Sequence, residues 1–196
     1  MNISIFTYMN KQIYYVVGVM SGTSLDGLDL SYIKFEFQEK WNFKIIKSAT
    51  FNYSSDWKTK LSNAILLGKD ELHNLDVEYS LYLSNKIAEF ILDNNVKKEA
   101  IVCSHGHTVF HQPENGITLQ IGNSIEIKNS LDNIIVCDFR VQDVKLGGQG
   151  APLVPIGDKL LFYDYDFCLN LGGFANISFE EEYKRIAFDI CPVNIV

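Results

Sequence analysis

The sequence lacks several features that mark large classes of protein. It has four cysteines, none of them in a CxxC pair, only four prolines, and fewer basic than acidic residues, 17 against 24. Without a run of basic residues, the chain offers no electrostatic footprint for nucleic acid. With 47% hydrophobic residues and no low-complexity segment, it is not disordered or collagen-like. We therefore expect a folded, acidic protein that handles small molecules and does not bind nucleic acid.

Cysteine usage and the length of the apolar runs predict the compartment. Cys103, Cys137 and Cys168 lie in apolar segments, where a free thiol behaves as a small buried hydrophobic group. Widely spaced cysteines of this kind are typical of a reducing environment. The early apolar run at 13–20 is far shorter than the ~20 residues that cross a bilayer, and no signal-peptide cleavage site follows it. The sequence predicts a cytoplasmic protein with no membrane partner.

Hydrophobic periodicity predicts an α/β fold. Three strand-like runs come first, and the first two are joined by a glycine-rich turn. Apolar residues at three- and four-residue spacing over 72–91 then predict a long helix, which Asn94 and Asn95 end. The other elements expected in this part are strands at 100–104, 118–121 and 133–139, a polar loop at 105–113, and a short helix at 124–130.

The segment 147–152 is rich in glycine and predicts a loop at a domain boundary. A helix at 155–162 and three more strands, at 167–171, 175–180 and 185–189, follow this loop. The order of strand, glycine turn and strand from the start of the chain begins here again. We expect a first lobe at 1–146, then a linker and the truncated beginning of a second, similar lobe at 147–196. No helix is predicted after the last strand, so this second sheet should keep an uncovered face.

The turn between the first two strands has the composition of a phosphate-binding loop. Its glycines allow backbone N–H groups to approach an anion closely, and Ser21, Thr23 and Ser24 add hydroxyl donors. Asp26 and Asp29 would repel a bare phosphate, so one of them is expected to hold a hydrated Mg²⁺. The alternative is an ordinary hairpin turn with capping hydroxyls. No Gly-Lys-Ser/Thr follows, which excludes a Walker loop.

Two further segments carry polar side chains at predicted strand ends. His105, His107 and His111 have a spacing that could supply three nitrogen ligands to zinc. The alternative is a polar loop that contacts a ligand or nearby backbone. Arg140 has the side chain best suited to grip a carboxylate or phosphate, although it could instead pair with a neighbouring aspartate.

The last part of the chain repeats the opening pattern. The segment 170–176 places a glycine turn between two strands and could form a second hairpin that faces a phosphate. Asp189 ends a predicted strand, from which a carboxylate can act as a general base on a sugar hydroxyl. A structural cap is the alternative role for this aspartate.

Taken together, these segments resemble the anhydro-N-acetylmuramic acid kinase family, which belongs to the actin- and hexokinase-like superfamily. The motifs follow one another in the family's order from about Tyr14 to the end of the chain. They lie at 18–29, 105–113, 118–122, 138–140, 146–155 and 169–178. The resemblance implies a ribonuclease-H-like mixed sheet flanked by helices. It also implies ATP-dependent phosphorylation with hydrolytic ring opening of 1,6-anhydro-N-acetylmuramic acid, which gives N-acetylmuramic acid 6-phosphate during peptidoglycan recycling.

The resemblance also implies roles for individual residues, with ATP and Mg²⁺ as cofactors. Asp26 would hold the metal, and Thr108, Asp138 and Arg140 would contact the amino sugar. Asp189 would activate the water that attacks the anomeric carbon, while the anhydro-ring oxygen takes the γ-phosphoryl group. The first phosphate loop would consist of Gly22, Thr23, Ser24, Leu25, Asp26, Gly27, Leu28 and Asp29.

The chain departs from the family's pattern in two respects. Family members are roughly twice as long. Ile190, Cys191 and Val193 also replace the threonine and both glycines of the family's Asp-Thr-Gly-Pro-Gly-Asn, which puts side chains where backbone should approach phosphate. The alternative hypothesis is therefore a catalytically incomplete remnant, or a sugar-binding half that needs a separately encoded C-terminal half. A homodimer is the other partner considered.

Overall fold

The computed structural model describes residues 13–22 and 24–193. Its largest element is a five-stranded sheet in the order β3-β2-β1-β4-β7. The first three strands form an antiparallel meander: β1 (Ile13–Ser21), β2 (Gly27–Phe37) and β3 (Trp41–Asn52). The other two, β4 (Ile101–Ser104) and β7 (Ile135–Cys137), run parallel to β1. This confirms the predicted α/β class and its mixed sheet.

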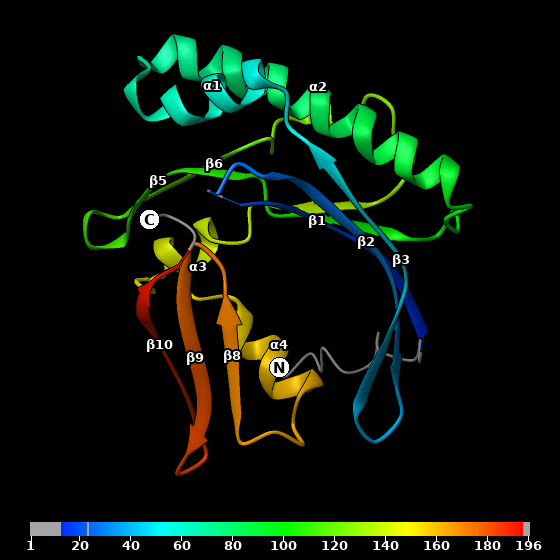
Figure 1. The fold of residues 1–196 in the computed structure, drawn as a ribbon, viewed down its shortest axis with the longest axis vertical. Coiled ribbons are helices and arrows are strands. Elements are labelled where there is room, and N and C mark those ends of the chain that lie inside the picture. Colours follow the sequence, from blue (N-terminus) through cyan, green and yellow to red (C-terminus); the bar gives the residue numbers. More distant parts are fainter. Residues whose placement is uncertain (1–12, 23, 194–196) are drawn as a thin grey trace, which may run out of the picture.

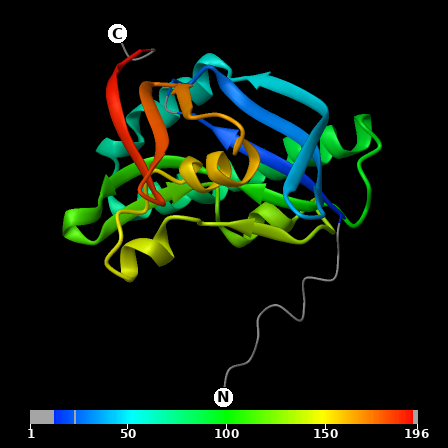
Figure 2. The ribbon, with the colours of Figure 1, turned by 90° about the horizontal axis from the view of Figure 1, so that it is seen from below.

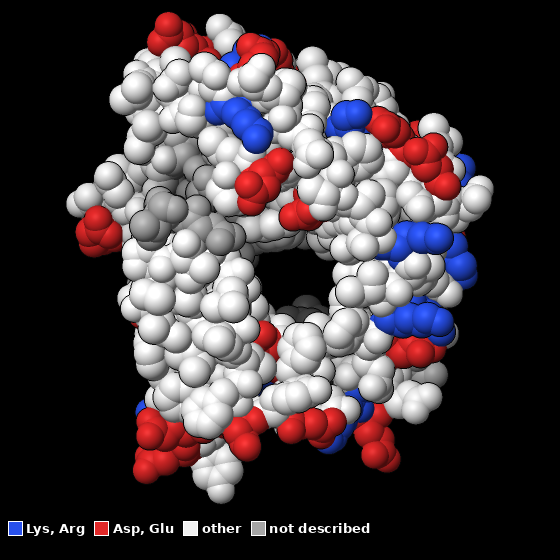
Figure 3. Space-filling view, viewed as in Figure 1, with Lys and Arg blue, Asp and Glu red and all other residues white. Residues whose placement is uncertain are grey.

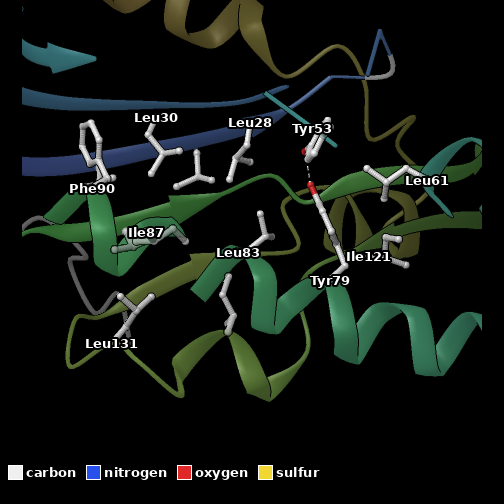
Figure 4. Close-up of a cluster of buried hydrophobic side chains, with 14 of the residues drawn as sticks. Leu28, Leu30, Tyr53, Leu61, Tyr79, Leu83, Ile87, Phe90, Ile121 and Leu131 are labelled. Atoms are coloured by element: carbon white, nitrogen blue, oxygen red, sulfur yellow. Dashed lines mark hydrogen bonds between the residues drawn. The ribbon is translucent and has the colours of Figure 1, made fainter. Parts of the chain in front are cut away.

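One face of this sheet is covered by helices (Figure 1). The chain leaves β3 through α1 (Ser55–Asn63), the short η2 (Ala64–Leu66) and α2 (Lys69–Asp93). Figure 4 shows side chains of α2 packed against those of the strands. Burial of each such aliphatic side chain contributes about 1.5–3 kcal/mol, so this layer forms the main core. Its largest fully buried members are Tyr79, Phe90, Leu28, Leu30, Leu83, Ile87, Ile121, Val17 and Val102.

The helix predicted from the periodicity at 72–91 is confirmed. The carboxylate of Glu71 accepts the backbone N–H of Gly68 at 3.0 Å and so satisfies a free donor at the helix start. At the other end Asn95 adopts a positive φ of 48°, which stops the helix where the sequence places its end.

A hairpin lies between β4 and β7. It consists of β5 (His107–Gln112), η3 (Pro113–Asn115) and β6 (Ile117–Ile121), and η4 (Ile125–Lys128) follows it. The prediction of a polar loop over 105–113 was therefore wrong from His107 onward. Half-buried Val109 and Phe110 pack against the core, and the turn after Gln112 brings the strand into register with β6. The predicted strand at 133–139 is also shorter, because Asp138 leaves the extended region with a φ of 59°.

The remainder of the chain forms a second, smaller sheet. After the unpredicted α3 (Val141–Lys145) and α4 (Val154–Leu161) come β8 (Phe167–Leu171), β9 (Phe174–Glu181) and β10 (Lys184–Pro192), in the order β10-β9-β8. All three strands pair antiparallel, and β8 and β9 form the hairpin that the sequence suggested around 170–176.

Helix α4 connects the two sheets (Figures 1 and 2). It lies on the side of the first sheet away from α2, where Phe162 packs edge-on against Phe43 at 5.6 Å between ring centroids. On its other side, Lys159 pairs with Glu180 of β9 at 2.7 Å. In the part of the chain that the structure describes, no helix is long and apolar enough to cross a bilayer.

Candidate functional site

The candidate site lies where the carboxyl ends of three parallel strands meet. β1 ends at Ser21, β4 at Ser104 and β7 at Cys137, and their pairing places these ends at one edge of the sheet. In open α/β sheets this edge is where ligands bind. The segments that follow these strands are the ones that the sequence singles out, so the fold brings three separated motifs together.

The β1–β2 turn offers accessible backbone at this edge. Gly22, Ser24 and Leu25 are half-buried and Asp26 is exposed, while Thr23 lies outside the described residues. The N–H of Leu25 donates to the carbonyl of Gly22 at 3.3 Å, and Leu25 itself has a φ of 57°. A non-glycine residue at positive φ stores strain that surrounding contacts must hold, which is common at ligand sites. The turn therefore keeps part of its surface accessible to solvent at this edge of the sheet.

Asp29 faces away from the core. Its neighbours Leu28 and Leu30 are buried towards α2, so alternation along β2 sends the Asp29 side chain to the opposite face, where it is exposed. There Oγ1 of Thr50 donates to Oδ1 of Asp29 at 2.5 Å. Figure 3 shows the molecule hollowed between the first sheet and α4, with acidic side chains above the opening.

A buried chain of hydrogen bonds anchors the β1–β2 turn from below. The hydroxyls of Tyr79 and Tyr53 are 2.6 Å apart, and Tyr53 donates to Oγ of Ser21 at 2.9 Å. This leaves the Ser21 hydroxyl free to donate to Nδ1 of His107, 3.1 Å away. These buried hydroxyl groups have hydrogen-bond partners, so breaking the series of bonds would be costly. The series therefore fixes the end of β1 relative to α2 and β5.

The histidines of the 105–111 segment do not converge on one point. Burial lowers the pKa of His107 to about 4, so this ring is neutral and accepts from Ser21. Burial, followed by the charge of Arg140, also lowers the pKa of His105. His111 is exposed and bonds to Thr118. Among residues 13–22 and 24–193, no three His, Cys, Asp or Glu side chains are placed to hold a metal ion, which argues against the zinc hypothesis.

Arg140 is held by the protein on two sides. Its Nε donates to Nε2 of His105 at 3.0 Å, and its Nη1 donates to the carbonyl of Gly150 at 2.7 Å. Gly150 has a φ of 64° and its N–H donates to Oδ2 of Asp143 at 2.6 Å. Arg140 therefore ties the glycine loop at 147–150 to the end of β4, and within residues 13–22 and 24–193 its Nη2 amino group makes no hydrogen bond to the protein.

Thr108 and Asp138 lie at the same edge. Thr108 is the second residue of β5 and pairs with Gln120, half-buried. Asp138 follows β7, and loss of hydration raises the pKa of its carboxyl. Its positive φ makes it the second strained non-glycine residue of the edge, after Leu25. Asp138 thus lies two residues before Arg140 in the chain, and Thr108 lies in the strand that follows His105, the hydrogen-bond partner of Arg140.

Asp189 belongs to the second sheet. It pairs with Asn176 across β9–β10, and Asn176 pairs with Asn170 across β8–β9, so the three side chains form one polar row on a single face. A register shift follows Asp189, and the N–H of Val193 donates to the carbonyl of Gly173 at 2.8 Å. Figures 1 and 2 both place the β8–β9 turn beside the β1–β2 turn. Asn194 lies outside the described residues.

Sequence reasoning missed a stripe of polar residues on α2. Asp76 accepts the N–H of Gly122 at 2.7 Å, Ser80 accepts that of Ser124 at 3.1 Å, and Ser84 accepts that of Ser130 at 3.0 Å. These bonds hold the segment after β6 against the helix. Their signal was present as a polar residue at every fourth position beside the apolar stripe, since such residues lie on one helix face.

The sheet order, the helices that flank the sheet and the loops gathered at its carboxyl edge are those of a lobe of the ribonuclease-H-like class, as found in the actin- and hexokinase-like superfamily. Within that class, the model of the family "Anhydro-N-acetylmuramic acid kinase" matches residues 14–196. The chain belongs to this family.

Curated relatives agree with this assignment. The anhydro-N-acetylmuramic acid kinase of Bacillus thuringiensis subsp. konkukian is 32% identical over 93% of this chain and 52% of its own length. A second enzyme of that name, from Bacillus thuringiensis strain Al Hakam, is 31% identical over 94% of this chain and 52% of its own. The Bacillus anthracis kinase is 32% identical with the same coverage as the first. The chain spans about half the length of the curated relatives that it matches.

Proposed function

We propose that this chain contributes to an anhydro-N-acetylmuramic acid kinase. In the proposed reaction, ATP phosphorylates 1,6-anhydro-N-acetylmuramic acid with hydrolytic opening of the anhydro ring, which gives N-acetylmuramic acid 6-phosphate for peptidoglycan recycling. Family membership supports the kinase class and the sugar. The observation that carries the proposal is the meeting of the β1–β2 turn, the His105 segment and Arg140 at one sheet edge.

The β1–β2 turn is the proposed phosphate loop. Residues 22–29 would hold the ATP phosphates through backbone N–H groups and the hydroxyls of Thr23 and Ser24. Mg²⁺ is commonly bound by one or two carboxylates together with phosphate oxygens and water, and exposed Asp26 fits that role. Asp29, exposed on the same side of the lobe as α4, is the other carboxylate within the loop. The ion would offset the charge that develops on the phosphoryl group.

The sugar would bind between the two sheets. Arg140, Asp138 and Thr108 are its proposed contacts, and the Nη2 group of Arg140 is the donor suited to a carboxylate such as the lactyl group of muramic acid. Asp189 would take a proton from water as the water attacks the anomeric carbon. The bond from that carbon to the bridging oxygen breaks, and this oxygen takes the γ-phosphoryl group as the bond from that group to ADP breaks and ADP leaves.

The second candidate is a half that is inactive without a complementary polypeptide. One observation favours it: Asp189, the proposed base, lies on an exposed strand of the second sheet. In either case we propose that the protein works in the cytoplasm, where its four free cysteines would stay reduced.

Isotope transfer tests the proposal. The chain is incubated with ATP, Mg²⁺ and the anhydro-sugar in water labelled with heavy oxygen, and the product is analysed by mass spectrometry. We expect a 6-phosphate that carries one labelled oxygen at the anomeric carbon, and loss of turnover by at least about a hundredfold in Asp189→Asn. Asp164→Asn, which changes an exposed aspartate outside the proposed site, is the matched control.

The same assay distinguishes the two candidates. Turnover by this polypeptide alone rules out the incomplete half. Turnover only after addition of the remaining half of a relative supports it. A labelled product that forms equally well with Asp189→Asn would contradict the proposed role of that aspartate.

A further inference from the structure

One face of the β8–β10 sheet is apolar and open to solvent. Ser178 bonds to Asp158 of α4, so α4 covers the face that carries Ser178, and alternation sends the neighbouring side chains to the opposite face. There Leu169 is 58% exposed and Phe188 is 51% exposed. Contiguous apolar surface of this kind marks an interaction site. We call this surface the open face; its exposed members are Phe167, Leu169, Leu171 and Phe188, which surround half-buried Ile177.

The same positions of the first sheet are buried. Val19 pairs with Leu30 across β1–β2, and Leu169 pairs with Ile177 across β8–β9. In each meander this pair lies two residues along the strands from the last pair before the glycine turn, which is Ser21–Leu28 in the first meander and Leu171–Ala175 in the second. In the first sheet α2 covers these positions, so that Val19 is 4% and Leu30 1% exposed. The repeated register predicts a helix on the open face.

The free edge of β8 supports the same conclusion. β1, the first strand of its meander, pairs with β2 on one side and receives the parallel strand β4 on the other. β8 pairs with β9, and no other strand of the described residues lies on its second edge. An unpaired edge exposes a row of N–H and C=O groups that can accept another strand. Both the helix and this strand would come from outside residues 13–193.

We propose that the open face and the edge of β8 form the docking surface for an α/β polypeptide equivalent to the half of the curated relatives that this chain does not span. The inference deepens the proposed function, on which it rests. The occupant has stated chemistry: an amphipathic helix lies on the open face, and a strand parallel to β8 pairs with its edge. About half of each relative's length lies outside the matched region, which is enough chain for both elements.

Binding between separately produced polypeptides tests the proposal. The full chain is mixed with the unmatched half of the Bacillus thuringiensis subsp. konkukian kinase, and complex formation is followed by analytical ultracentrifugation. The fluorescence of a dye that binds exposed apolar surface is read in parallel. We expect a one-to-one complex and a fall in dye fluorescence as the open face becomes buried.

Single substitutions locate the contact. Leu169→Lys and Phe188→Lys are expected to weaken the complex about tenfold or more, since each puts a charge on the apolar face. Tyr183→Lys is the matched control, because Tyr183 is 97% exposed in the β9–β10 turn and lies off the open face. Circular dichroism verifies that all variants fold.

Each alternative outcome overturns the proposal. Absence of a complex does so, as does a complex that neither open-face variant weakens. Self-association of this chain that Leu169→Lys abolishes would assign the face to a second copy instead. Because the readout is binding, a complex without phosphoryl transfer would contradict the proposed function and leave the docking surface intact.

Discussion

The two β-meanders of this chain have matching registers but differ in what supports them. In the first, α2 covers one face, and the hydroxyls of Tyr53 and Tyr79 anchor the glycine turn through Ser21. In the second, the corresponding face is open, and the described contact to the glycine turn is one backbone bond from Val193 to Gly173. Strand pairing therefore forms the meander in both places. Burial of its side chains and anchoring of its turn depend on the other segments that pack against it.

The largest expected difference between the meanders concerns truncation of a leucine. Leu30→Ala should lower the free energy of unfolding by about 2–5 kcal/mol, because it leaves a cavity under α2. Leu169→Ala should cost less than about 1 kcal/mol, because that side chain is already largely in water. Urea denaturation of both variants measures the contrast. Equal losses would mean that the open face is packed in solution.

Acidification should next weaken the anchor of the first turn. His107 has a pKa of about 4 in the fold against an unfolded value near 6.5, so the unfolded state binds more protons between these values. Stability due to this group is fully present above pH ~6.5 and decreases by up to about 3 kcal/mol as the pH falls to ~4. His105, whose pKa is also lowered, acts in the same direction.

His107→Gln isolates this contribution. An amide can still bond to Ser21 but does not titrate, so the variant's unfolding free energy should depend less on pH over this window. Chemical denaturation at several pH values gives the two curves. Parallel curves for the two proteins would show that His107 is not buried in its neutral form.

Removing one hydroxyl from the anchor should have a smaller effect. Tyr53→Phe deprives Ser21 of its donor and leaves the Tyr79 hydroxyl without a partner, at a cost of about 1–2 kcal/mol. Tyr165→Phe, at a residue that is 66% exposed, is the control and should be neutral. Thermal melts compare the stabilities of the two variants. A Tyr53→Phe variant as stable as the unmodified protein would show that this hydrogen bond does not stabilise the fold.

The smallest effect is expected at the polar row of the second meander. Asp189→Asn should change the unfolding free energy by less than about 0.5 kcal/mol, since the side chain is exposed and no hydrogen bond from it is found among the described residues. A loss above that size would assign Asp189 the structural role of a cap. Urea denaturation provides this measurement alongside the activity assay.

Much of the architecture could be predicted from local pattern. The spacing of Leu72, Leu75 and Tyr79 predicted α2, and the glycine turns predicted where the meanders fold back. The β5 strand was missed because its own residues are polar and aromatic, and only pairing with β6 settles its conformation. Helix α3 was missed because its five residues are too few to show a helical hydrophobic periodicity.

The candidate site was less accessible to sequence reasoning. Motif spacing drew attention to Arg140 and His105, but their mutual hydrogen bond depends on β4 and β7 becoming neighbours in the sheet. The role of Asp143 in holding the N–H of Gly150 likewise depends on how the glycine loop turns back on α3. Zinc was a reasonable hypothesis from spacing alone. The structure argues against it because the three histidine rings bond to different residues, Arg140, Ser21 and Thr118, and do not converge on one point.

Amide hydrogen exchange of the chain alone tests most directly whether the first meander is stabilised by the packing of α2 while the second meander lacks such a cover. The account predicts slow exchange for the amides of 16–21 and 28–32 and exchange that is faster by at least about a hundredfold for those of 167–171 and 175–179, with the second set slowing when the complementary half is added. Equal protection of the two meanders in the isolated chain would contradict it.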